Sequence, residues 1–228
     1  MKPRFIKLFL ALFLPFASFL LLAHFLFYYN NKYENNPVYP MGGVMFCSDA
    51  DLSGDSVIFL AHQWNFFPGK QYTPSDFNEK SVTGGTFLTL GSFGNFSLGS
   101  TSEASNGTAT YRLTLSLPDT ARTYSLYLPE IFSAYTLYLN EEKVCSQGNP
   151  DPAHYQDLIG NKEISFTASG TVHITIIVTN YSHIYSGITY PPAFGTVTAI
   201  QKYLSTRLFI SGLSLIHISE PTRLLSIS

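Results

Sequence analysis

A strongly apolar run without Asp, Glu, Lys or Arg occupies residues 8–29, directly after Lys2, Arg4 and Lys7. It holds about 22 residues. At about 1.5 Å per residue, a helix of this length reaches about 33 Å, enough to cross the hydrocarbon core of a bilayer. Because positive charge before a spanning helix stays in the cytoplasm, we expect a protein of the cell membrane with residues 31–212 on the extracytoplasmic side.

The same run can also be interpreted as a cleavable signal peptide. Such peptides usually have a shorter apolar stretch, which ends at a cleavage site flanked by small residues. Ala17 and Ala23 are small, but no clear small-x-small site follows the run. The sequence therefore favours an uncleaved transmembrane signal anchor over residues 1–30, with a cleaved signal as the alternative and export in both cases.

Charge is scarce and balanced in this chain, which has 12% charged residues, 15% aromatic residues and a net charge of −2. Low charge combined with many aromatic residues argues against intrinsic disorder. The balance also argues against nucleic acid as a partner, since a nucleic-acid-binding face needs an excess of Lys and Arg to neutralise phosphates. Cys47 and Cys145 form no C-x-x-C pair, and the sequence leaves open whether they pair with each other.

Beyond a linker at residues 31–53, which can add an edge strand, the hydrophobic pattern has a period of two. Tyr111, Leu113, Leu115 and Leu117 alternate with polar residues, which places them on one face of a strand that Pro118 ends. Other strands are predicted at residues 57–60, 87–90, 124–128, 134–139, 144–145 and 171–178. Short strands between Gly and Pro turns predict an all-β domain over residues 54–198, either a β-sandwich or a jelly roll, preceded by one transmembrane helix.

The last part of the chain changes character. Ile200, Leu204 and Leu208 lie four residues apart, which predicts a juxtamembrane helix over residues 199–212. Residues 213–223 read Leu-Ser-Leu-Ile-His-Ile-Ser-Glu-Pro-Thr-Arg and resemble one reading frame of a transposase adapter used in sequencing libraries. We therefore interpret residues 213–228 as foreign to the gene, with an ordinary short strand as the alternative.

No catalytic constellation is present at the level of sequence. The chain has no G-x-S-x-G elbow, no S-x-x-K, no H-E-x-x-H and no phosphate-binding loop. The histidines of the exported part have no metal-ligand spacing, and they are His62, His154, His173 and His183. We therefore predict no catalytic residue, no metal ligand and no cofactor, and we expect His173 to be a structural residue within a strand.

Four blocks of sequence carry a resemblance to a known family. They are residues 59–70 (Phe-Leu-Ala-His-Gln-Trp-Asn-Phe-Phe-Pro-Gly-Lys) followed by 73–77, residues 107–113 (Gly-Thr-Ala-Thr-Tyr-Arg-Leu), residues 128–140 followed by Gly148, and residues 178–183 followed by 186–188 and 194–195. In order and spacing they resemble the extracellular domain, of the galactose-binding-like type, of bacterial seven-transmembrane receptors with diverse intracellular signalling modules. One departure is that Ala61 or His62 stands where a glycine is usual.

The resemblance implies a galactose-binding-like jelly roll that senses an extracellular ligand and is not itself an enzyme. It also implies that seven membrane helices should follow residue 212 in the intact gene. A cytoplasmic output module, such as a histidine kinase or a cyclic-di-nucleotide synthase, would come after them. The chain would then be a fragment of a membrane signalling receptor.

The candidate ligand-binding residues lie mainly in the long aromatic and polar loop at residues 181–190. They are Tyr181, His183 and Tyr185, with Asn180 just before the loop and Tyr135 in a predicted strand. Loops carry binding residues more often than strands do, and an aromatic ring can stack on the C–H face of a pyranose. We therefore expect a small extracellular ligand, with carbohydrates as the favoured class.

Other conspicuous residues have structural interpretations. We expect Trp64 in the core, Tyr111 and Arg112 packing within the sheet, and Asn140 in a tight turn. Two alternative functions stay open. The jelly roll could be the accessory domain of an exported glycoside hydrolase, or a structural cell-surface module that contacts another protein.

Overall fold

The computed structural model describes residues 3–34, 36–79, 82, 84–90, 105–151 and 153–224. The chain divides into two compact units, Met1–Asn36 and Pro37–Ser228. The first unit consists mainly of helix α1 (Pro3–Asn30), which contains Pro15. Its segment Phe9–Tyr29 is long and apolar enough to cross a membrane, and none of it is buried. The apolar helix predicted from the sequence is therefore confirmed.

The end of α1 is marked by polar and cationic side chains. Asn31 donates hydrogen bonds from both its backbone N–H and its side-chain Nδ2 to the carbonyl oxygen of Phe27, at 3.0 and 2.8 Å. The ammonium group of Lys32 lies 4.0 Å from the centre of the Tyr29 ring and 5.0 Å from that of Tyr33. Cation–π contacts of this kind and a polar C-terminal cap are expected where an apolar helix meets water.

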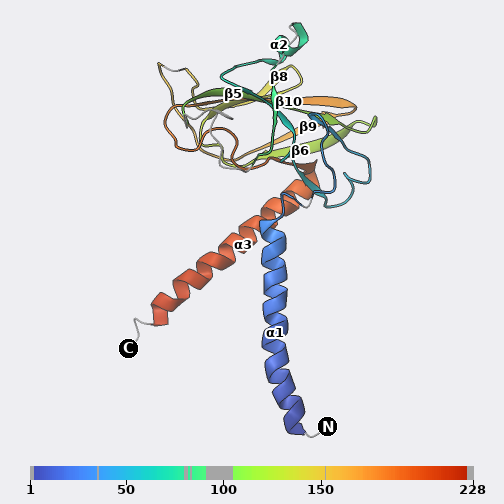
Figure 1. The fold of residues 1–228 in the computed structure, drawn as a ribbon, viewed down its shortest axis with the longest axis vertical. Coiled ribbons are helices and arrows are strands. Elements are labelled where there is room, and N and C mark those ends of the chain that lie inside the picture. Colours follow the sequence, from blue (N-terminus) through green and yellow to red (C-terminus); the bar gives the residue numbers. More distant parts are fainter. Residues whose placement is uncertain are drawn as a thin grey trace. The chain divides into compact units, whose positions relative to one another are not determined.

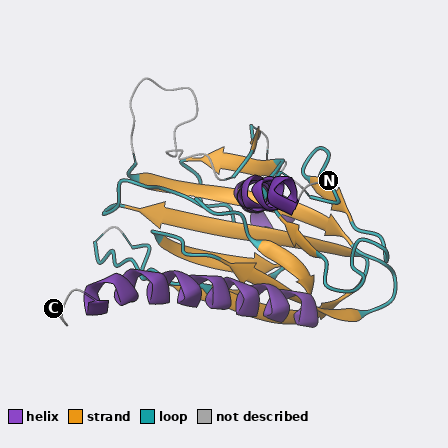
Figure 2. Cartoon of the chain, turned by 90° about the horizontal axis from the view of Figure 1, so that it is seen from below, coloured by secondary structure: helices purple, strands orange, loops and turns teal. Residues whose placement is uncertain are grey.

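The second unit is a sandwich of two β-sheets (Figures 1 and 2). The larger sheet has seven strands, in the order β4 (Thr86–Leu88), β3 (Trp64–Pro68), β5 (Gly107–Ser116), β10 (Thr171–Asn180), β7 (Ala134–Leu139) and β8 (Glu142–Gln147), with β1 (Val44–Phe46) beside β5. The smaller sheet has the order β2 (Val57–Phe59), β11 (Ala193–Thr196), β6 (Arg122–Leu128) and β9 (Lys162–Ala168). From β5 to β11 the chain crosses repeatedly between the two sheets, as in a jelly roll, so the predicted fold class is confirmed.

Alternation along the central strands builds the core. On β5, Tyr111, Leu113 and Leu115 are buried against the smaller sheet, while Arg112 and Thr114 point to the outer face. The whole length of β10 pairs with β5, from Thr171 opposite Ser116 to Asn180 opposite Gly107. Burying one large aliphatic side chain contributes about 1.5–3 kcal/mol. The two longest strands thus supply the centre of the larger sheet.

Aromatic rings fill the space between the sheets. Trp64 is fully buried, as predicted, and its indole N–H donates to the carbonyl oxygen of Leu60 at 2.7 Å. Tyr124 of the smaller sheet lies 5.4 Å from Phe194, centre to centre. Buried Trp needs such a partner for its N–H, and offset or tilted ring pairs add to the free energy gained by burial.

The expected linker contributes an edge strand, as the sequence allowed. Strand β1 pairs in parallel with the second half of β5, Val44 lying opposite Thr114. Strand β3 occupies the first half of the same edge of β5, with Asn65 opposite Arg112. The two strands meet at Gly43, which has a φ of 78°, and a Cβ atom there would lie 2.6 Å from Nδ2 of Asn65. Glycine is therefore required at this junction.

Two helices flank the sandwich. The short α2 (Pro74–Glu79) lies on the outer side of the larger sheet (Figure 1). Helix α3 (Val197–Leu224) starts against the smaller sheet, where Thr196 Oγ1 accepts a hydrogen bond from the N–H of Ala199 at 3.2 Å. This helix includes residues 199–212, where the sequence predicts one. It continues through residues 213–224, while residues 225–228 lie outside the described part, and the foreign origin of residues 213–228 stays a prediction.

The first turns of α3 are held by apolar and polar contacts with the sandwich. Ile200 is buried, and the ring of Tyr203 lies 5.6 Å from Phe59 and 6.4 Å from Tyr127, centre to centre. Arg207 donates to the Tyr127 hydroxyl at 3.0 Å. The start of α3 is therefore docked on β2 and β6 rather than attached only through β11.

Candidate functional site

Three connections meet at one end of the sandwich. They are residues 129–133 between β6 and β7, residues 148–161 between β8 and β9, and residues 181–192 between β10 and β11. Antiparallel pairing brings them together, because Thr179 near the end of β10 lies opposite Ala134 at the start of β7. We call this end of the sandwich the loop cluster.

Asn180 sets the shape of the longest of these connections. Its Nδ2 donates to the carbonyl oxygens of Ser105 at 2.8 Å and His183 at 2.7 Å. Its Oδ1 accepts from the N–H of His183 at 3.1 Å. The side chain is completely buried and both its donor hydrogens are used. Asn180 therefore positions the loop and has no donor left for a ligand.

His183 and Tyr185 form an aromatic cluster with Phe132. The His183 ring is stacked on Phe132, with ring centres 4.9 Å apart and planes 20° apart. The Tyr185 ring lies 5.4 Å from His183 and 6.1 Å from Phe132. The backbone N–H of Tyr185 donates to His183 Nδ1 at 3.1 Å, which leaves the proton of the neutral imidazole on Nε2. Stacking and this hydrogen bond together fix the orientation of the imidazole ring.

Tyr181 belongs to a second group, shared with the β8–β9 connection. Its ring meets Tyr155 edge-on at 5.3 Å. Beside it, Ser182 Oγ donates to a carboxylate oxygen of Asp157 at 2.8 Å. The Tyr155 hydroxyl is buried and has no hydrogen-bond partner among the described residues. These contacts tie the two connections together and combine exposed aromatic surface with polar groups.

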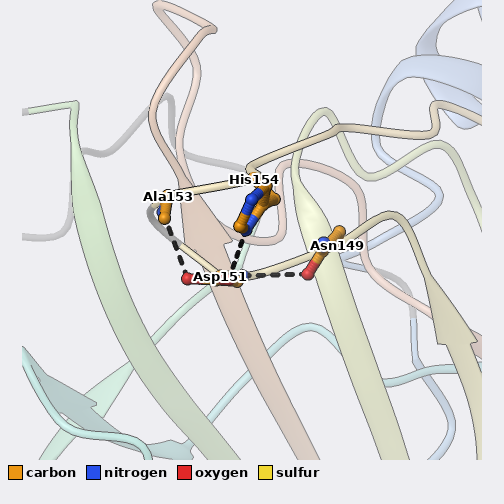
Figure 3. A network of polar contacts seen from close by, with 4 residues as sticks. All are labelled: Asn149, Asp151, Ala153 and His154. Carbon is orange, nitrogen blue, oxygen red and sulfur yellow. Dashed lines mark hydrogen bonds and ion pairs between the residues drawn. The ribbon is translucent and has the colours of Figure 1, made fainter.

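The turn before Tyr155 is held by a small polar network (Figure 3). The N–H of Asp151 donates to Asn149 Oδ1 at 3.1 Å, and one carboxylate oxygen of Asp151 accepts from the N–H of Ala153 at 3.1 Å. The other carboxylate oxygen lies 2.9 Å from Nδ1 of His154. Hydrogen bonds from His154 first, and then from Ala153, hold the pKa of the Asp151 carboxyl below its usual value. The network stabilises the backbone that presents Tyr155.

The structure brings four of the five predicted residues together and separates the fifth. Tyr181, His183 and Tyr185 lie in the loop cluster with Asn180, and Tyr181 and Tyr185 are 41% and 37% exposed. Tyr135 is only 1% exposed and is part of the hydrophobic core, where burial raises the pKa of its hydroxyl. Since its ring has no exposed face for a ligand, Tyr135 does not belong to this site.

The site also contains residues outside the predicted ligand set, namely Tyr155 and Ser182, and in addition Phe132 and Asp157. Phe132 lies in the third family-like block, directly before the buried Ser133, and gave no signal beyond being an aromatic residue in a short connection. Asp157 is one of many scattered carboxylates, and only its contact with Ser182 distinguishes it. Phe132 and Asp157 reach the site only because connections that are far apart in the sequence meet there.

The described residues offer little for covalent or metal chemistry. No group of three or more His, Cys, Asp or Glu that could hold a metal ion occurs among them. In the same ranges Cys47 and Cys145 are both free. Burial, followed by the charge of Asp51, raises the pKa of the Cys47 thiol to about 12, so it stays protonated at neutral pH. The loop cluster itself combines exposed tyrosine rings with hydrogen-bonding side chains.

Comparison with known proteins gives distant structural matches only. No family model and no curated protein matches the chain. A Faecalibacterium prausnitzii β-glucuronidase has a TM-score of 0.44 at 13% identity, over 60% of this chain and 31% of the enzyme. A GH2 β-galacturonidase from Eisenbergiella tayi bound to galacturonate has a TM-score of 0.43 at 12% identity, over 62% and 24%. The chain thus spans less than a third of the length of these enzymes.

Proposed function

We propose that this chain is the extracytoplasmic ligand-sensing domain of a membrane signalling receptor and that its ligand is a carbohydrate. The loop cluster carries this proposal. The connection at residues 181–192 presents exposed tyrosine rings on a backbone that Asn180 holds by hydrogen bonds, and Asp151 holds the neighbouring β8–β9 connection in the same way. Sites for small ligands combine apolar or aromatic surface with a few placed polar groups.

Sugars suit this combination of groups. The exposed rings of Tyr181 and Tyr185 offer apolar faces of the kind that stack on pyranose C–H groups. Ser182 and Asp157 supply a hydroxyl and a carboxylate beside Tyr181, and His183 supplies a ring nitrogen beside Tyr185. A ligand with one apolar face and several hydroxyl groups can use both kinds of surface at once.

The apolar helix supports a position at the membrane. Lys2, Arg4 and Lys7 precede or begin the span Phe9–Tyr29, and by the positive-inside rule this order directs residues 31–212 away from the cytoplasm. A sandwich on that side would meet extracellular ligands directly.

Helix α3 would connect the loop cluster to the membrane helices that we expect after residue 212. Glu130 and Phe132 lie in the same five-residue connection, residues 129–133. Phe132 is stacked on His183, while Glu130 lies 3.9 Å from the guanidinium group of Arg207 on α3. A ligand that binds differently to two positions of this connection would therefore also bias the position of α3.

A thermal-shift screen of the full chain in detergent micelles tests this function. Because a ligand that binds only the native form stabilises it, at least one sugar should raise the unfolding midpoint. The variant Tyr185→Ala should lose that shift. Phe46→Ala is the matched control and should keep the shift. Phe46 is an exposed aromatic residue on β1 and lies at the end of β5 that is remote from the loop cluster. If no sugar shifts the midpoint, or if Tyr185→Ala keeps the full shift, the carbohydrate site is wrong.

The role of accessory domain in an exported glycoside hydrolase is the second candidate. The same jelly roll and the same sugar surface suit it, and only the sequence that follows distinguishes the two. We expect the gene beyond residue 212 to encode seven apolar segments. A β/α barrel in their place would favour the hydrolase.

A further inference from the structure

A pocket with a volume of about 400 Å³ lies on the outer face of the larger sheet, beneath α2. It is lined by Pro74, Asn78, Arg112, Asn140, Glu141 and His173. Asn140 and Glu141 form the turn between β7 and β8, which is at the opposite end of β7 from the loop cluster. This pocket, which we call the sheet-face pocket, is therefore separate from the candidate site described above.

Helix α2 forms one wall of the sheet-face pocket and fixes the position of Arg112. At the start of α2, Asp76 accepts hydrogen bonds from the N–H and the hydroxyl of Thr73, at 2.9 and 2.8 Å. The ring of Phe77, which also packs against Phe67, lies 4.0 Å from the central carbon of the Arg112 guanidinium group. Arg112 is thus held by a cation–π contact.

The floor and far wall are also rigidly built. Asn140 has a φ of 54°, and its Oδ1 accepts from the N–H of His173 at 2.8 Å. His173 Nδ1 lies 3.0 Å from Thr114 Oγ1. Glu141 accepts a hydrogen bond from Nδ2 of Asn78 at 2.7 Å, which joins the turn to α2. Hydrogen bonds therefore hold the pocket open from both sides.

Arg112 has an unused hydrogen-bonding capacity in this setting. Its NH1 atom is buried and has no hydrogen-bond partner among the described residues. A buried cationic donor without a partner costs free energy, and the guanidinium group that carries it borders the sheet-face pocket. Burial first, and then the Arg112 charge, lowers the pKa of His173, so His173 is neutral at neutral pH and Arg112 is the cation of the pocket.

We propose that the sheet-face pocket binds a small carboxylate-bearing ligand with hydroxyl groups, of the uronic-acid type. The planar fork of Arg112 matches a carboxylate, with which it can form two parallel hydrogen bonds. Glu141 and Asn78 lie across the pocket and offer an acceptor and an amide to ligand hydroxyl groups. The inference depends on Arg112 and not on the loop cluster, so it does not require the proposed function.

Isothermal titration of the full chain in detergent micelles tests the proposal with a matched pair of probes, D-glucuronate and D-glucose, which differ at C6 by a carboxylate. We expect D-glucuronate to bind at least about tenfold more tightly, and added NaCl to weaken its binding. Arg112→Gln should remove this preference. Arg122→Gln is the matched control, since Arg122 lies on β6 and pairs with Asp49, and should retain it.

Glu141→Gln gives a second test if Arg112→Gln fails to fold. Glu141 is exposed, and removing its negative charge should tighten D-glucuronate binding about twofold to threefold by reducing repulsion of the ligand. The proposal is overturned if D-glucuronate binds no better than D-glucose, if a folded Arg112→Gln variant retains the preference, or if Glu141→Gln weakens binding of the acid. If the chain binds D-glucuronate but no neutral sugar, the result counts against the loop cluster and supports this pocket.

Discussion

The hydrogen bonds of one buried residue, Asn180, determine the geometry of the loop cluster. The amide of Asn180 binds two carbonyl oxygens and one N–H, all from the backbone. No other side chain of similar size offers two donors and an acceptor in this arrangement. Asparagine is therefore needed here for the loop to form.

We expect Asn180→Asp to lower the free energy of unfolding by about 1–3 kcal/mol, because a carboxylate would face two carbonyl oxygens that lose their donor. Urea denaturation can be followed by the fluorescence of Trp64, the single tryptophan of the chain. Asn106→Asp is the control, since Asn106 is exposed. Equal losses in the two variants would show that the hydrogen bonds of Asn180 are unimportant.

Gly148, at the start of the β8–β9 connection, allows a comparison with Gly170, since both have positive φ angles of 72° and 64°. A Cβ atom at Gly148 would collide with the carbonyl oxygen of Gln156, whereas one at Gly170 would have no atom within 4 Å. Gly170→Ala should therefore cost only backbone strain, about 1–2 kcal/mol. Gly148→Ala should cost more in the same urea titration, and similar costs would exclude the collision.

At the scale of elements, the partly buried ring of Tyr203 contributes to the docking of α3 beside Ile200 and Arg207. Tyr203→Ala should lower the protection of the first turns of α3 against hydrogen exchange, because it removes the contacts with Phe59 and Tyr127. Phe209→Ala is the control on the same helix, since Phe209 is 67% exposed. Unchanged protection in Tyr203→Ala would mean that other contacts hold the helix.

The longest alternating strands were predictable, whereas several others were missed. Strands β5 and β10 have ten residues each and a clear period of two. Strand β3 was missed because Trp64, Phe66 and Phe67 are apolar without strict alternation, and β11 because it has only four residues. Strand β9 was missed although Ile164, Phe166 and Ala168 alternate with polar residues along it. Helix α2, with six residues, is too short for a helical period to be visible.

The sites show the same limit. The loop at residues 181–190 was predictable from its aromatic and polar composition. Tyr135 could have been excluded, because it is in phase with Leu137 and Leu139, which predicts the core face of β7. The sheet-face pocket was not predictable, since it combines Arg112 with residues that the sequence places on other strands, a turn and a short helix.

At the scale of the whole molecule, His173 links stability to pH. Its pKa in the folded protein lies below the ordinary value of 6.5, so the unfolded chain binds a proton more readily. This contribution to stability is fully present above pH 6.5 and is lost as the pH falls towards the folded pKa. Asp51 and Asp151, whose pKa values lie below 3.8, act only in a more acidic range.

We therefore expect the free energy of unfolding to decrease as the pH is lowered from about 7 to about 5. His173→Gln should flatten that decrease, because glutamine keeps a polar group near Thr114 without titrating. Urea titrations at a series of pH values measure both slopes. The same slope in the variant and the parent chain would assign the effect to other groups.

The five-residue connection that carries both Glu130 and Phe132 has a reciprocal consequence. If ligand binding at Phe132 changes the strength of the contact between Glu130 and Arg207, thermodynamic linkage requires a change in that contact to alter the affinity for the ligand by the same factor. An antibody or neighbouring subunit that clamps α3 would then change the dissociation constant of the ligand without touching it.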